Sequence, residues 1–192
     1  ADDWSCYCPV CRKRFEDYYG YPMPRYMTND VKLFRWREAL VVLSDTSKAL
    51  KELNPNLEIT CCVHATQNGY YVSEYRGYDN WDMVASCPYF DVFSTTIVNW
   101  ALPEDFYRDI TERTVAVAKK YGKKSERWFM GYYKQPKDWK QVDNWADIAD
   151  QAGVDRIAAW TYRGGYGTVV GAPDALKLWD VIGENYKRVL KK

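Results

Sequence analysis

Four short apolar segments, each followed by a stretch with helical spacing, constrain the fold of this chain most strongly. Strand and helix alternate without a hairpin signal between them, so the strands should run parallel with right-handed crossovers. Helix boundaries are marked by residues such as Pro103, which suits a first helical turn, and Gly122, which suits a helix end. The predicted strands cover residues 57–63, 89–98, 127–133 and 154–162, and a further helix covers 31–53.

Two architectures satisfy this alternation: an open doubly wound sheet and part of an eight-fold βα barrel. The first strand is not followed by Gly-x-Gly-x-x-Gly, and the sequence contains no GxxxxGK[ST] phosphate loop. The opening segment is typical of the loop and helix that follow a missing strand. We therefore predict an α/β fold of parallel βα units that form the carboxyl-terminal half of a (βα)8, or TIM, barrel. The whole of 1–192 would be one domain, with a cysteine loop and a helix in 1–56 and four strand-helix units in 57–192.

Composition excludes some classes of function. The chain has 192 residues and a net charge of +1, which gives no electrostatic reason to expect nucleic acid or an acidic membrane surface as a partner. No apolar run approaches the roughly 18 residues that cross a bilayer. Nine Trp and seventeen Tyr suit a core, and they also suit surfaces that stack on sugar rings.

Three thiols lie within six residues, at Cys6, Cys8 and Cys11. This spacing is too tight for an ordinary internal disulfide, but it suits wrapping of the chain around one soft metal ion. Structural zinc takes four ligands, so a fourth would come from elsewhere in the chain or from a part of the parent protein outside it. The alternatives are reduced cysteines in a loop or disulfides to distant partners. Reduced cysteines would favour the cytoplasm, although the compartment stays open.

The run C-Y-C-P-V-C-R-K-R-F at residues 6–15, followed by Tyr19 and Gly20, resembles a segment of the thermophilic β-galactosidase family of barrel glycosidases. In that family the three cysteines join an earlier one around zinc. The resemblance therefore implies that Cys6, Cys8 and Cys11 bind a structural zinc, with the fourth ligand upstream of Ala1. The rest of the chain agrees with the family in architecture only.

The sequence departs from the pattern of that family at both catalytic positions. The family places a Glu acid/base shortly before the cysteines, where this chain has Asp2 and Asp3. It places a Glu nucleophile at the end of the seventh strand, where residues 131–135 contain no carboxylate. We therefore name Asp2 and Asp3 as the candidate catalytic residues, with solvated terminal residues as the alternative.

The chemistry of a βα barrel lies at the carboxyl ends of its strands. The residues at these ends are aromatic or polar, which suits stacking on a sugar and hydrogen bonding to its hydroxyl groups. Core packing, rim packing or ion pairing is the alternative for each of them. The candidate substrate-binding residues are His64, Trp100, Tyr132, Tyr133, Trp160, Tyr162 and Arg163.

These features predict a glycoside hydrolase-like barrel protein that acts on a carbohydrate and carries a structural zinc. A non-catalytic carbohydrate-binding or scaffold barrel is the first alternative, and a zinc-stabilised interaction domain is the second. An isolated half barrel would leave two strand edges open, so we also expect pairing with a missing amino-terminal half-barrel or with a second copy.

Overall fold

The structure, a computed structural model, describes residues 6–64, 80–96, 103–132, 136–169 and 171–190. The chain forms two compact units. One contains the described residues up to 59 and those of 80–90, and the other contains 60–64 and the described residues from 91 onward. We describe each unit by itself, and the single-domain organisation stays a prediction.

The first unit is helical and contains an element that the sequence interpretation missed. Helix α1 (Pro9–Tyr19) begins directly after Cys8, so the second half of the predicted cysteine loop, from Pro9 to Cys11, is helix and the loop assignment was wrong there. Proline suits a first helical position because its missing N–H needs no partner in that turn. At the other end, Gly20 adopts a left-handed φ of 76°, which ends the helix.

Helix α2 (Asn29–Leu53) follows. It ends at the predicted residue and begins two residues before the predicted start at 31. The Thr28 side chain caps it by accepting a hydrogen bond from the Val31 N–H at 3.2 Å. The Phe15 ring of α1 is fully buried and meets the Phe34 ring of α2 edge-on, with 5.4 Å between ring centroids. Together with Met23 and Val31, these rings form the small core that joins α1 to α2. A short helix, α3 (Trp81–Ala85), completes the described part of this unit.

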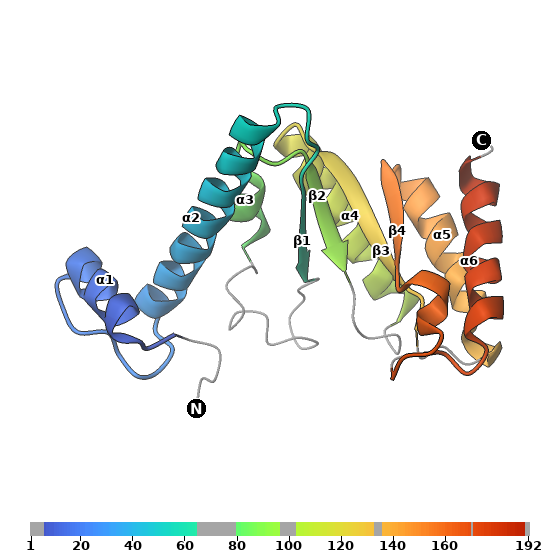
Figure 1. The fold of residues 1–192 in the computed structure, drawn as a ribbon, viewed down its shortest axis with the longest axis horizontal. Helices are drawn as coiled ribbons and strands as arrows, with labels where there is room; N and C mark the ends of the chain where they lie inside the picture. The colour runs from blue at the N-terminus through green and yellow to red at the C-terminus, as the bar shows by residue number, and fades with distance from the viewer. Residues whose placement is uncertain (1–5, 65–79, 97–102, 133–135, 170, 191–192) are drawn as a thin grey trace. The chain divides into compact units, whose positions relative to one another are not determined.

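The second unit confirms the predicted α/β class. Its sheet has the order β1-β2-β3-β4 and all of its pairs are parallel. The four arrows in Figure 1 accordingly point the same way. The strands lie at or near the predicted places and are mostly shorter than predicted. They are β1 (Thr60–His64), β2 (Val92–Thr96), β3 (Lys124–Met130) and β4 (Arg156–Trp160).

Three helices pack against one face of this sheet: α4 (Glu104–Lys120), α5 (Lys140–Ala152) and α6 (Ala175–Leu190). On β3, the Phe129 ring lies 6.0 Å from the Trp145 ring of α5 and 6.1 Å from the Tyr186 ring of α6. Short 3-10 turns, η2 (Pro136–Asp138) and η3 (Tyr162–Gly165), precede α5 and follow β4. No helix in the described ranges is long and apolar enough to span a membrane.

A fully buried cation, Arg127 of β3, lies between the sheet and α4. Its Nε donates to the Thr111 hydroxyl at 3.1 Å, and its Nη1 donates to the Thr95 carbonyl at 2.9 Å and to the Thr95 hydroxyl. The guanidinium also lies over the Tyr107 ring, 4.8 Å from its centroid. Burial lowers the pKa of Arg127, because a charged group loses hydration in the core.

Side chains alternate along a strand, so the contacts of Arg127 and Phe129 show which residues of β3 point to each face of the sheet. These two residues face the helices, and Glu126, Trp128 and Met130 therefore face the opposite side. In a βα barrel that opposite side is the barrel interior. The residues of this interior face, near the carboxyl ends of the strands, are the ones that can form a binding site.

Candidate functional site

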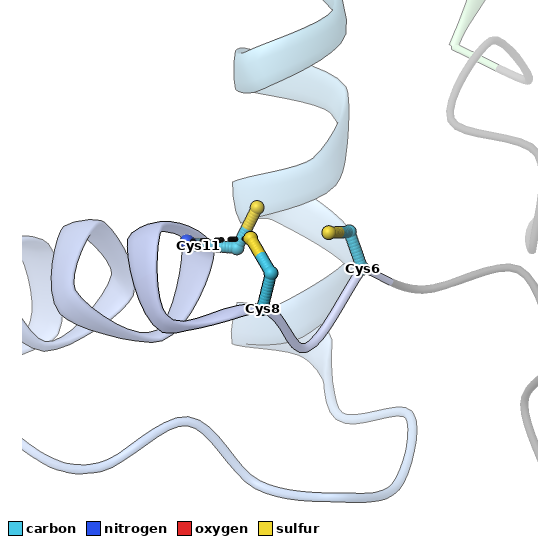
Figure 2. Close-up of side chains that lie close together, drawn as sticks. All are labelled: Cys6, Cys8 and Cys11. Carbon is cyan, nitrogen blue, oxygen red and sulfur yellow. Dashed lines mark hydrogen bonds between the residues drawn. The ribbon is translucent and has the colours of Figure 1, made fainter.

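The three thiols predicted to bind metal do lie together. The sulfur atoms of Cys6, Cys8 and Cys11 all lie within 4.8 Å of one another, and Figure 2 shows them clustered at the start of α1. Around a tetrahedral zinc with Zn–S bonds of about 2.3 Å, the sulfurs would be about 3.8 Å apart. Small side-chain rotations would therefore bring this cluster onto one ion, so the residues fit a zinc site.

The electrostatics of the cluster follow from its place at a helix start. The Cys11 N–H points at the Cys8 sulfur, 3.5 Å away, and this backbone hydrogen bond is the largest cause that lowers the pKa of Cys8 to about 7. Cys11 is partly buried, and its burial, followed by its contacts with Cys6 and Cys8, raises its pKa to about 12. The helix start thus stabilises the thiolate form of one cysteine, Cys8. A bound cation would be needed to stabilise all three cysteines as thiolates.

Within the part of the chain that the structure describes, the metal-binding group contains only these three residues. A fourth ligand at the zinc therefore stays a prediction, as does its place upstream of Ala1.

The second candidate site lies at the carboxyl ends of the strands. The strand register aligns His64 with Thr96 and then with Trp128, so these side chains share one face of the sheet. All three are partly exposed. Adjacent strands are about 4.8 Å apart, which places His64 about 10 Å from Trp128 across the sheet. That separation is of the size of one sugar ring with its hydroxyl groups.

Two tryptophans meet on this face. The Trp128 ring lies 6.4 Å from the Trp160 ring at the end of β4, tilted by 41°. The Trp160 side chain is 56% exposed, although it belongs to a strand of the sheet. The Trp128 Nε1 donates to the Glu126 carboxylate at 2.7 Å, and this hydrogen bond fixes the plane of the indole. The exposed Trp160 ring is the more available of the two for a ligand.

The predicted residues after β4 lie beside Trp160. Tyr162 is 67% exposed, and its ring packs edge-to-face with the Trp179 ring of α6, with 5.3 Å between ring centroids. The Arg163 guanidinium lies over the Tyr162 ring, 5.3 Å from its centroid. The Arg163 backbone has a φ of 50°, in the left-handed region that few residues other than glycine adopt. Tyr162 therefore packs on the rim with part of its surface and leaves the rest open, and its role in substrate binding stays a prediction.

Sequence reasoning missed two residues of this site, Glu126 and Trp128. The strand was predicted to start at residue 127, which left Glu126 outside it, and Trp128 was placed in the strand without a role. The two-residue period of Glu126, Trp128 and Met130, all facing the interior, was the signal that could have identified them.

Several predicted site residues lie outside the described ranges: Asp2, Asp3, Trp100 and Tyr133. Tyr132, two residues after the end of β3, is described and partly buried. Among the described residues that directly follow the four strands, none is Asp or Glu.

Comparison with solved structures supports the barrel architecture. The chain is similar to a candidate α-L-fucosidase from Bacteroides thetaiotaomicron, with a TM-score of 0.54, 12% identity and 80% of this chain covered. It is also similar to an endo-1,4-β-mannanase from Rhizomucor miehei, with a TM-score of 0.61, 11% identity and 91% of this chain covered. In each case the match spans 50% of the other chain. The chain has a half-barrel fold.

No protein-family model matches the sequence, and no curated protein matches it either. The likeness at 11–12% identity therefore establishes the half-barrel fold, and it does not identify the thermophilic β-galactosidase family.

Proposed function

We propose that this chain is the carboxyl-terminal half of a glycosidase-like barrel that binds a carbohydrate at the carboxyl ends of β1 to β4. The observation that carries the proposal is the pair of Trp128 and Trp160 on the interior face, with Trp160 more than half exposed. The C–H face of a pyranose stacks on such a ring, which gives an amphipathic ligand a large contact area. Both structural neighbours are named as glycosidases, which supports a sugar as the ligand.

Polar groups around the tryptophan pair suit the hydroxyl groups of a sugar. His64 lies in the same row as Trp128, and Arg163 follows β4 beside the exposed Tyr162 ring. An imidazole and a guanidinium supply directional donors at the edge of a stacking surface. The proposed site therefore combines a ring for the sugar face with donors for its hydroxyl groups.

Catalysis at this site would require carboxylates in addition to the tryptophan pair. Glycoside hydrolysis usually requires two carboxylates that flank the scissile bond. The described residues directly after the strands contain none, so the acid/base role falls to Asp2 or Asp3 and the nucleophile would come from elsewhere. The same observation favours the alternative of a non-catalytic carbohydrate-binding barrel. Hydrolysis of a chromogenic glycoside that is lost in an Asp2→Asn/Asp3→Asn variant would separate the two.

The cysteine cluster has a structural role in this proposal. Zinc held by Cys6, Cys8 and Cys11 would fix the segment before α1. In the sequence, this segment follows the candidate catalytic residues Asp2 and Asp3 closely. A closed structural zinc site supplies stability without taking part in the reaction.

Replacement of the exposed indole tests the site. In Trp160→Ala, the association constant for an oligosaccharide should fall about tenfold or more, because a lost stacking contact costs on the order of 1.5 kcal/mol. Isothermal titration calorimetry with mannotetraose, fucosyllactose and a galacto-oligosaccharide as probes measures this change. Tyr26→Ala removes another exposed ring, one that belongs to the helical unit, and should leave the affinity unchanged. Equal binding by wild type and Trp160→Ala, or no binding of any probe, contradicts the proposal.

A further inference from the structure

The cysteine cluster contains a Cys-x-x-Cys pair, Cys8 and Cys11, placed across the first turn of α1. Cys8 is the residue that caps the helix, and Cys11 is the third residue of the helix. This spacing at a helix start is also that of proteins that exchange thiols with disulfides. The zinc role proposed above uses the three cysteines alike, so it leaves the special relation of this pair without a function.

The side chains of the pair face each other. The Cys11 N–H donates to the Cys8 sulfur at 3.5 Å, so the Cys8 side chain lies folded over the first helical turn (Figure 2). The two sulfur atoms lie within 4.8 Å of each other, so side-chain rotation with a small backbone adjustment would bring them to disulfide distance. In contrast, a single residue separates Cys6 from Cys8, which is too tight for an unstrained disulfide. The helix start thus removes the expected obstacle to an internal disulfide for Cys8 and Cys11.

The two thiols differ in their access to solvent. Cys8 is exposed, whereas Cys11 is partly buried and packs against the small core that contains Phe15. A disulfide that approaches from solution would therefore reach Cys8 more easily than Cys11. The packing of Cys11 holds its thiol beside the sulfur that such an encounter would modify. One accessible thiol with a shielded neighbour is the arrangement that a two-step exchange requires.

We propose that Cys8 and Cys11 form a redox-active dithiol that reacts with a low-molecular-weight disulfide such as glutathione disulfide. In the first step the Cys8 thiolate attacks one glutathione sulfur, the S–S bond of the glutathione disulfide breaks, and one glutathione thiolate leaves. In the second step Cys11 loses its proton to solvent and attacks the Cys8 sulfur, which expels the second glutathione and forms the Cys8–Cys11 bond. The protein thiols lose an electron pair, and the glutathione disulfide gains it.

This oxidation and zinc binding compete for the same sulfur atoms. Closure of the disulfide would remove Cys8 and Cys11 from the proposed zinc site and leave Cys6 alone. The exchange itself needs no metal and stands without the zinc proposal, whereas the loss of zinc on oxidation rests on that proposal. The cluster would bind zinc under reducing conditions and release it under oxidising conditions.

Oxidation of the metal-free chain tests the exchange. The chain is stripped of metal with a chelator and incubated in glutathione buffers of rising oxidised fraction, and the remaining thiols are alkylated and located by peptide mass spectrometry. Cys8 and Cys11 should lose their free thiols together and appear as one disulfide-linked pair. Cys6 and Cys62, which is also exposed, should still be alkylated at the oxidised fraction where the pair has closed.

Two variants separate the steps of the exchange. In Cys11→Ser the reaction should stop at a glutathione adduct on Cys8, because no thiol remains to resolve it. In Cys6→Ser the rate of disulfide formation should stay within about threefold of wild type, because Cys6 takes no part in either step. Circular dichroism of each variant checks that the helices are intact.

A second measurement follows zinc by competition with a chromogenic chelator. The dissociation constant for zinc should be at least about 100-fold higher for the oxidised chain than for the reduced chain. Free thiols at Cys8 and Cys11 under conditions where Cys62 reacts, a disulfide that uses Cys6, or an unresolved glutathione adduct in wild type overturns the proposal. A chain that forms the Cys8–Cys11 disulfide and binds no zinc in the reduced state would support the exchange and contradict the zinc site alone.

Discussion

Replacement of Arg127 with alanine should lower the free energy of unfolding of the sheet unit by about 3 kcal/mol or more. The side chain is fully buried and joins β3 to β2 through Thr95 and to α4 through Thr111. Its loss would leave a cavity between sheet and helix, together with buried hydroxyl and carbonyl groups that had accepted from the guanidinium. Urea denaturation followed by circular dichroism measures the change.

Arg127→Met separates the volume of the side chain from its charge. Methionine nearly fills the same space and removes the cost of burying a cation, so this variant should lie within about 1.5 kcal/mol of wild type. A loss under about 1 kcal/mol in Arg127→Ala would show that the hydrogen bonds of this residue do not hold α4 to the sheet.

Loss of one thiol should remove zinc from the cluster at the start of α1. In Cys8→Ser the dissociation constant for zinc should rise by about 100-fold or more, because a serine hydroxyl does not replace a thiolate as a zinc ligand. Wild type should retain one zinc per chain after dialysis, measured by plasma mass spectrometry, and the variant should retain much less.

Cys62→Ser makes the same exchange at an exposed cysteine of β1, which lies outside the cluster, and should leave the zinc content unchanged. A wild-type chain free of zinc, with Cys6, Cys8 and Cys11 protected from alkylation as disulfides, would show that the cluster does not serve as a metal site.

The half-barrel fold was predictable because its signals are local. Apolar runs such as 89–98 mark strands, and helix-start and helix-stop residues separate them, so order and direction follow from sequence spacing. Helix α1 was missed because the cysteine spacing suggested a loop. In fact Cys8, Pro9 and Gly20 are a suitable cap, first residue and terminator for a helix.

The candidate site was predictable only in part, for a related reason. Cys6, Cys8 and Cys11 lie within six residues, so the chain can bring them together whatever the rest of the fold does. The Trp128 and Trp160 pair depends on the register between β3 and β4, which no local pattern fixes. The start of β3 was placed three residues late, and Glu126, which orients the Trp128 indole, was lost with it.

The central claim is that a sugar binds at the carboxyl ends of β1 to β4. Hydrogen–deuterium exchange with and without mannotetraose, followed by mass spectrometry of short peptides, tests it most directly. The account predicts slower exchange in the peptides that contain Trp128–Met130 and Trp160–Arg163, with no change at Lys124–Ser125. Protection confined to the amino ends of the strands, or to the helices, would contradict it.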